Sequence, residues 1–453
     1  MRIQLTAVLF AALTAVAPLG SARAQPVNDA SVLALATRID NNSFDRGQLM
    51  IGNQMQYWQP VFDTLLVVEP DGTIAPNMAS AWSYNADNTV LALTLREGIS
   101  FTDGTPFDAE AVRANFEHLR ASGGQNSFAM AAITGIEIVS PLEVRLQLSE
   151  PDPALLTNLG LVGGAMASPA SLTAADAATN PVGSGPYVYD SAQSVAGRAY
   201  VYRRNADYWN AAAFPYDTIT LMPMLDQVAR LNALRSGQID GGLGDARTVA
   251  EAEASGLVVN SNSVDWLGLT IADREGRLVP ALADVRVRRA IAMAVDAASV
   301  LRYIDMERGI LTNQIFPEQS EAFLPALDAA YPYDPEAARA LLAEAGYAEG
   351  FTLSMPELNS MANINPIIEQ MLAAIGITVE WVAIAPNATI SELRSGRYPV
   401  FVFQFGYQGT WAEFRKFLFP TAPWNPSQVN DPALVALITE AQMATAAQHW
   451  AAL

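Results

Sequence analysis

The sequence contains no cysteine, a single lysine (Lys416) and only two histidines (His118 and His449). The lack of cysteine excludes disulfides, thiolate metal sites, cysteine catalysis and an anchor attached through a lipidated cysteine. Two histidines far apart in the sequence do not predict a metal centre. We therefore expect neither a metal nor a cofactor.

Positive charge is scarce throughout the chain. Lysine and arginine together number 26, against 46 aspartates and glutamates, so the net charge is −20. A surface this acidic repels phosphate groups, and we expect neither nucleic acid nor anionic lipid as a partner. The solubility of a secreted protein is the simplest reason for such a charge.

Long apolar runs are confined to the N-terminus. One covers residues 5–19 after Arg2, and Ala22-Arg23-Ala24 precedes Gln25, which is typical of a cleavable secretory signal over residues 1–24. This run is too short for a membrane span, and no other run is long enough. The sequence thus predicts a periplasmic protein that is soluble, not lipidated and not inserted into a membrane.

Strand-like and helix-like segments alternate along the rest of the chain. Its 453 residues exceed one ordinary core, so two or three lobes are expected. Ser31–Ile39 and Thr218–Met222 have the pattern of strands, and a helix is expected to start at Asp226. Asp284 and Asp334 are expected to begin further helices. This alternation predicts an α/β fold.

Residues 93–107 form the most informative segment of the chain. They alternate like a half-buried strand and then make two tight turns. A helix is expected next, with Thr105 as its N-cap and Pro106 at its first position. The apolar spacing of Gln54–Leu66 predicts another helix further upstream.

Several blocks of residues, taken in order, resemble one known family. They are residues 62–66 with 71–79, residues 95–107, residues 181–187 with 204–209, residues 230–240 and residues 284–291. The chain is similar here to the periplasmic substrate-binding proteins of peptide-, nickel- and oligosaccharide-type ABC importers, called extracellular solute-binding family 5. The similarity spans residues 31–445.

The resemblance implies a three-lobed fold of the large, type II periplasmic-binding-protein class, in which two α/β lobes share a hinge and a smaller lobe is inserted. The expected boundaries are 25–70 and 183–270 for lobe I, 71–182 for the inserted lobe II and 271–430 for lobe III. Residues 431–453 are expected to start a return to lobe I whose end is missing from this chain. Hinges are expected near Gly183–Pro186 and Trp266–Ile271.

The function that the resemblance implies is solute capture between lobes, followed by delivery to membrane ABC permease subunits, with the receptor acting as a monomer. The residues themselves do not indicate an enzyme. Ser184 lies in Gly-Ser-Gly and lacks the Gly-x-Ser-x-Gly spacing of a nucleophile elbow, and no acid–base pair stands out among the carboxylates. A secreted hydrolase is the alternative from another class. Dipeptide or oligopeptide binding is the alternative within the family.

The best candidate for ligand contact is Gln404–Trp411, which follows the almost wholly apolar strand Val400–Phe405. Aromatic and amide side chains interleaved with glycines suit a binding cleft. The matching segment of the family lines the ligand cavity. Packing of Phe405 and Trp411 inside the third lobe is the structural alternative.

This segment also departs from the family. Peptide-binding members usually carry an aspartate here that pairs with the ammonium group of the ligand, whereas Gln408, Gly409 and Thr410 stand at this place. A buried ammonium group without a carboxylate is poorly compensated. The departure therefore favours a neutral or hydroxyl-rich ligand, and Arg38 or Arg274 could instead meet an anionic group.

The predicted ligand-binding residues are Asn41, Asn42, Ser43, Trp266, Asn363, Gln404, Phe405, Tyr407, Gln408 and Trp411. Asn41–Ser43 follow the first strand and Asn363 precedes a helix, so ordinary turns explain them as well. Trp266 either lines the hinge or packs in a core. No catalytic residue and no metal ligand is predicted, and the ligand can be a peptide, an oligosaccharide, an opine or a chelated metal.

Overall fold

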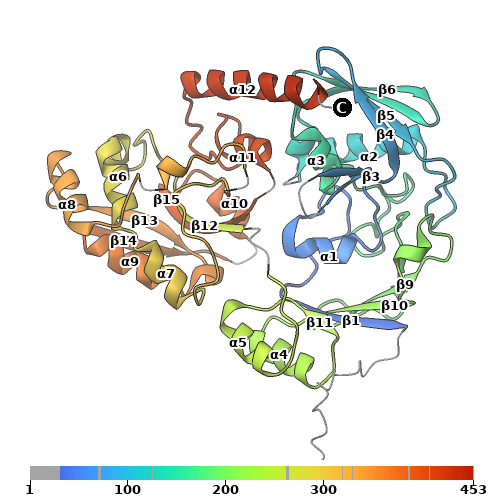
Figure 1. Ribbon diagram of the computed structural model, residues 1–453, viewed down its shortest axis with the longest axis horizontal. Coiled ribbons are helices and arrows are strands. Elements are labelled where there is room, and N and C mark those ends of the chain that lie inside the picture. Colours follow the sequence, from blue (N-terminus) through green and yellow to red (C-terminus); the bar gives the residue numbers. More distant parts are fainter. Residues whose placement is uncertain are drawn as a thin grey trace, which may run out of the picture.

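The computed structural model describes residues 31–451 except 70–72, 125, 262–264, 319, 329, 386–387 and 408, and it describes no side chains from residue 442 onward. The predicted signal over residues 1–24 lies outside the described residues. Three groups of elements are separate in space (Figure 1). We call them the first lobe, around β1, the second lobe, around β4–β7, and the third lobe, around β12–β15.

The first lobe is built on a five-stranded sheet with the order β11-β1-β10-β9-β8. Its strands are β1 (Val32–Thr37), β8 (Tyr187–Tyr189), β9 (Tyr200–Arg204), β10 (Thr218–Pro223) and β11 (Gly241–Gly242), and its helices are α1 (Met55–Trp58), α4 (Gln227–Arg235) and α5 (Ala246–Ala254). Strand β1 pairs in parallel with both β10 and β11. The sheet thus joins the start of the described chain to strands more than a hundred residues later.

The second lobe is an antiparallel sheet with the order β4-β5-β7-β6, covered by helix α2. Its elements are β2 (Leu66–Val68), β3 (Ile74–Pro76), β4 (Ala79–Tyr84), β5 (Val90–Leu95), α2 (Ala109–Ala121), β6 (Ile133–Ser140), β7 (Glu143–Leu148) and α3 (Leu155–Leu159). Leu91 and Leu93 alternate toward the core, where Val112 and Phe116 of α2 are also fully buried. The alternating segment seen in the sequence is therefore scaffold.

The prediction that Thr105 caps α2 is wrong. Asp108 is the N-cap, and its side chain accepts a hydrogen bond from the backbone N–H of Ala111 at 2.9 Å. Residues 105–107 stay extended because the N–H of Phe107 donates to the carbonyl of Ile99 at 2.9 Å. Thr105 and Asp108 are both residue types that cap helices. The strand-like pairing of Phe107 prevents a helix from starting at Thr105, so the helix starts after Asp108.

The helix predicted over Gln54–Leu66 is also wrong in its length, since α1 covers only Met55–Trp58. The chain then turns, and Thr64 forms an isolated bridge with Ala165 before β2 begins. Pro60 has no N–H to continue a helix. The apolar residues that suggested helical spacing are buried in an irregular segment instead.

The third lobe contains two pairs of strands among its helices. The strands are β12 (Asp265–Ile271), β13 (Phe351–Glu357), β14 (Ile377–Ala383) and β15 (Val400–Gly406), and the helices are α6 (Val285–Ala294), α7 (Ala297–Tyr303), α8 (Pro335–Glu344), α9 (Asn365–Ala373), α10 (Thr389–Leu393) and α11 (Thr410–Phe417). The predicted starts of α6 and α8 are confirmed, since Asp284 and Asp334 are their N-caps and accept backbone hydrogen bonds there.

Strand β12 pairs with β15 over its whole length, with Trp266 opposite Phe405. Residues 265–270 are therefore paired with a strand more than a hundred residues further along the chain, and the lobe boundary expected at residue 270 stays a prediction. The remaining lobe boundaries also stay predictions.

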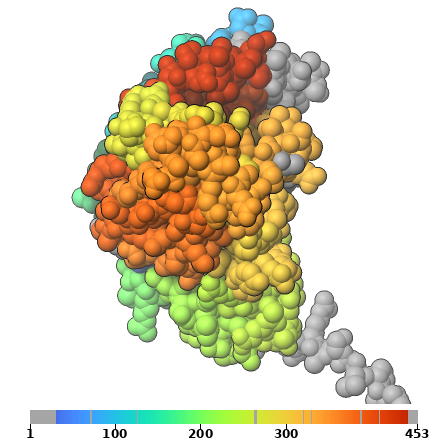
Figure 2. Space-filling view, turned by 90° about the vertical axis from the view of Figure 1, so that its left-hand side faces the viewer, coloured from blue at the N-terminus to red at the C-terminus, as the bar shows by residue number. Residues whose placement is uncertain are grey.

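Helix α12 (Pro432–Ala451) is the last described element. It lies along the top of the molecule in Figure 1, and Figure 2 shows it above the surface of the third lobe. None of the helices that the structure describes combines the length and the apolar character that a membrane span requires.

Candidate functional site

The predicted ligand segment joins β15 to α11. Strand β15 ends at Gly406, and α11 begins at Thr410 after Gly409, whose φ of +104° suits glycine because it lies outside the range that other residues commonly adopt. In Figure 1, α11 lies on the side of the third lobe that faces the second lobe. The segment therefore reaches the boundary between two lobes.

Two of the predicted aromatic residues pack in the third lobe, Phe405 within its core and Trp266, partly buried, against it. Phe405 is only 4% exposed, and its ring centroid lies 4.8 Å from that of Trp266 and 4.9 Å from that of Phe417. The indole N–H of Trp266 donates to the Glu413 carboxylate at 3.4 Å. The structure favours the packing role that the sequence had left open for Phe405 and Trp266.

Other predicted residues of this segment remain partly accessible. Gln404 is exposed, and its amide donates to the Asp265 carboxylate at 2.7 Å. Tyr407 and Trp411 are half-buried, and the indole nitrogen of Trp411 has no acceptor among the described residues. Gln408 lies outside the described residues. The accessible part of the segment is thus amide and aromatic in character.

An ion pair under the segment ties α11 to the end of β15. The ammonium of Lys416 lies 2.6 Å from the Glu413 carboxylate and donates to the carbonyl of Gly406 at 2.7 Å. Glu413 is fully buried and Lys416 is 6% exposed. Burial lowers the pKa of Lys416, and the negative charge of Glu413 opposes this shift. The pair orders the turn that carries the accessible residues.

A second ion pair joins the third lobe to the second. The guanidinium of Arg415 in α11 contacts the Glu150 carboxylate, just after β7, at 2.6 Å. Asp152 is buried nearby, and burial raises the pKa of its carboxyl while the charge of Arg415 opposes the rise. No local sequence pattern marks these partners, so the sequence analysis missed them.

The remaining predicted residues lie elsewhere. Asn41, Asn42 and Ser43 follow β1 in a loop with mostly local contacts: the N–H of Asn41 meets the Asp40 carboxylate at 2.8 Å, and the Ser43 hydroxyl accepts from the N–H of Asp45 at 3.0 Å. These contacts describe a turn. Asn363 is exposed just before α9.

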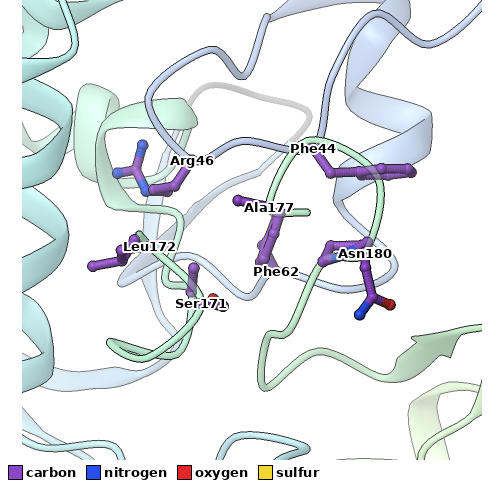
Figure 3. A pocket seen from close by; sticks show the side chains of 9 residues that line it. Phe44, Arg46, Phe62, Ser171, Leu172, Ala177 and Asn180 are labelled. Carbon is purple, nitrogen blue, oxygen red and sulfur yellow. The ribbon is translucent and has the colours of Figure 1, made fainter. Parts of the chain in front are cut away.

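Of two hollows among the described residues, neither is lined by the segment between β15 and α11. The first is about 10 Å³ and lies beside Arg46, Phe44 and Phe62 (Figure 3). It is water-sized and too small for an organic solute. Arg46 is 2% exposed, burial lowers its pKa to about 9, and its guanidinium donates to the carbonyls of Ala165 and Gly163. Arg46 thus ties the loop after β1 to residues 163–165.

The second hollow lies in the third lobe and measures about 190 Å³. Its lining residues are Glu357, Ala362, Asn365, Pro366, Glu369 and Trp381. The indole of Trp381 donates to Glu369 at 2.8 Å. Ala362 and Asn365, which flank the predicted Asn363 in the sequence, both line this hollow.

The described residues present little that resembles catalytic chemistry. His118 lies 3.1 Å from the Asp45 carboxylate, on the part-buried surface between α2 and the loop after β1. Within the described ranges, no group of three or more histidine, cysteine or acidic side chains is placed to hold a metal ion. The arrangement offers contacts for a ligand through amide, aromatic and carboxylate groups.

Comparison with known proteins agrees with this arrangement. The family model for bacterial extracellular solute-binding proteins, family 5 Middle, matches residues 73–422. The glutathione-binding protein GsiB of Pectobacterium atrosepticum is 26% identical over 381 residues, covering 78% of this chain and 70% of that protein. GsiB of Salmonella typhimurium is 25% identical over 394 residues, covering 82% and 74%.

Solved structures share the fold at lower identity. The periplasmic binding protein AgaA of A. tumefaciens R10, in complex with agropinic acid, has a TM-score of 0.80 at 22% identity and covers 93% of this chain and 88% of its own. DppA of Helicobacter pylori, in complex with the peptide STSA, has a TM-score of 0.76 at 21% identity and covers 92% and 89%. The predicted class of fold is thereby confirmed. The family match also confirms the predicted class of function, and the chain belongs to family 5 of the bacterial extracellular solute-binding proteins.

Proposed function

We propose that this chain captures a small organic solute between its lobes in the periplasm and delivers it to the permease subunits of an ABC importer. The family match over residues 73–422 carries this proposal. The protein releases the solute chemically unchanged, as a receptor and not as a hydrolase. It acts as a monomer after removal of its signal and without a lipid anchor.

The accessible residues between β15 and α11 are the proposed contact surface, in particular Gln404, Tyr407 and Trp411. Their position supports the proposal, because the Arg415–Glu150 pair brings α11 against the second lobe. A solute held there would touch two lobes at once. Contact with both lobes favours the closed arrangement over the open one and so couples binding to closure.

The named relatives indicate the size of the solute. GsiB is named for glutathione, AgaA was solved with agropinic acid and DppA with a four-residue peptide. All three ligands are small and carry several polar groups. We therefore place a peptide-like or opine-like solute first. A dipeptide or oligopeptide receptor is the narrower form of the same proposal.

A thermal-shift screen tests the proposal. The mature protein is heated with glutathione, short peptides, agropinic acid, oligosaccharides or chelated nickel, and a solute that binds the folded state raises the melting temperature. The stabilising solute is then recovered and examined by mass spectrometry. Recovery of the unchanged solute supports a receptor. Conversion of the solute to products shows a hydrolase instead.

A further inference from the structure

Most charged groups around the segment between β15 and α11 already have partners of opposite charge. Glu413 and Lys416 pair with each other in the core, and Arg415 pairs with Glu150 across the lobes. The segment itself presents amide and aromatic groups. Any charge selection of a solute must therefore come from a group outside this segment.

Glu321 supplies such a group from the loop between α7 and α8. Its carboxylate accepts a hydrogen bond from the hydroxyl of Thr410, the first residue of α11, at 2.8 Å. Glu321 is exposed, and no lysine, arginine or histidine among the described residues forms an ion pair with it. Its negative charge is thus uncompensated and faces solvent beside the proposed contact surface.

Buried hydroxyl groups hold this carboxylate in place. The Thr410 hydroxyl lies 2.7 Å from that of Ser320 and 3.2 Å from that of Tyr407. Thr410 is 4% exposed and Ser320 is 8% exposed. Thr410 has one hydroxyl proton, so when it donates to Glu321, Ser320 and Tyr407 donate to Thr410. This chain of hydrogen bonds fixes the position of the Glu321 carboxylate.

Aromatic rings contact one another on the two segments that the Thr410–Glu321 hydrogen bond joins. The ring of Trp411 lies 5.2 Å from that of Phe414, and Phe414 lies 5.1 Å from Phe316, five residues before Glu321. An organic cation gains from a carboxylate and from the faces of aromatic rings together. A solute that carries only negative groups would be repelled by the uncompensated charge.

We infer that Glu321 makes this receptor selective for solutes that carry an ammonium or a similar organic cation. This carboxylate comes from a loop that is distant in sequence from residues 404–411, and residues 404–411 themselves contain no acid. The inference rests on the proposed function, because it requires that solute binds beside α11. It also changes the expectation from the sequence, which favoured a neutral ligand.

Paired probes test the inference. Glutathione, trialanine, dialanine and free amino acids are each compared with their N-acetyl derivatives, which differ in the charge of one nitrogen. Thermal shift ranks the pairs, and calorimetry measures the affinity of the best pair for the wild-type protein. The amine-bearing member is expected to bind about tenfold more tightly, as one charged and partly exposed hydrogen bond allows.

The variant Glu321→Gln keeps the size of the side chain and removes its charge. It is expected to lose about tenfold in affinity for the amine and to bind the acetylated partner as the wild type does. Glu318→Gln, an exposed carboxylate in the same loop, is the matched control and should change neither affinity. Circular dichroism checks that both variants fold.

The possible results separate this inference from the proposed function. If the wild type binds acetylated and free probes equally, or if Glu321→Gln retains the preference, the inference is overturned while the receptor function stands. If none of these probes stabilises the protein but another solute of the thermal-shift screen does, the inference is overturned and the receptor function stands; if no solute of that screen stabilises it, both fail. Two results together support both the inference and the receptor function. Trp411→Ala then loses binding of all probes, whereas Glu321→Gln loses only the preference for the amine.

Discussion

The guanidinium of Arg415 and the carboxylate of Glu150 lie 2.6 Å apart, although 265 residues separate them in the sequence. Arg415 belongs to α11 of the third lobe, and Glu150 follows the last strand of the second lobe's hairpin. The contact is partly exposed, with 24% of the arginine side chain and 45% of the glutamate side chain accessible. Such a pair opens at low cost and re-forms easily, which suits two lobes that must separate and meet again.

Replacing Arg415 by glutamine should loosen the closed arrangement. An exposed pair contributes up to about 1 kcal/mol, so we expect solute affinity to fall by a few-fold. The effect should fade in high salt, which screens exposed charges. Calorimetry at two salt concentrations measures it. Arg397→Gln, which breaks a pair with Glu392 inside the third lobe, is the control, and an equal loss there would argue against an interlobe role.

Lys416→Met should destabilise the third lobe strongly. The substitution leaves the fully buried Glu413 without its counter-charge, which costs about 3–5 kcal/mol. The double variant Lys416→Met with Glu413→Leu removes both charges and should recover much of that loss. Urea unfolding followed by tryptophan fluorescence measures the free energies. A double variant no more stable than Lys416→Met would show that packing, and not charge, is responsible.

Asp63 should make stability depend on pH. Its carboxylate accepts hydrogen bonds from Tyr208 and Trp209, at 3.1 and 3.3 Å, and burial raises its pKa from 3.8 to about 6. The folded state therefore holds a proton that the unfolded state releases between these values. The protonated carboxyl stabilises the folded state by about 3 kcal/mol. This stabilisation is complete below pH 3.8 and is lost as the pH rises through 6.

Asp63→Asn isolates the contribution of Asp63 to the pH dependence of stability, because the asparagine amide does not titrate. The variant and the wild type should have similar stability near pH 4, and the variant should become the more stable one toward pH 7.5. Melting temperatures across this range measure the difference. Parallel curves for the two proteins would mean that the pKa of Asp63 is not raised by folding.

Trp411→Ala tests the contact surface. Removing a half-buried indole from a ligand site should lower the affinity for the stabilising solute at least tenfold, because aromatic side chains contribute much of the contact area. Trp381→Ala removes another half-buried indole of the third lobe, on the distant strand β14, and should leave affinity unchanged. Unaltered binding by Trp411→Ala would place the solute elsewhere.

Local signals in the sequence predicted part of the fold correctly. Asp284 and Asp334 were identified as helix starts because a cap, its first turn and the following apolar spacing all lie within a few residues. The prediction for Thr105 was wrong because Asp108, a competing cap, stands three residues later and the backbone bond from Phe107 to Ile99 keeps residues 105–107 extended. The pairing of β12 with β15 was not predicted, because the two strands are remote in the chain.

The candidate site was likewise predicted only where the signal was local in the sequence. The dense aromatic and glycine composition of residues 404–411 was visible in the sequence. Composition did not show that Phe405 is covered by rings from Trp266 and Phe417 while Trp411 stays partly accessible. Nor did it show that Glu321 reaches Thr410, since the two residues are 89 positions apart and neither is unusual in its own surroundings.

The burial of Lys416 has a practical consequence, because it is the chain's only lysine. An amine-reactive label will modify its side chain only when α11 moves away from the end of β15, where the ammonium is held by Glu413 and Gly406. The rate of labelling at this one side chain, followed by mass spectrometry, therefore reports how often the turn opens. Comparing that rate with and without solute would reveal how firmly the bound molecule holds the turn shut.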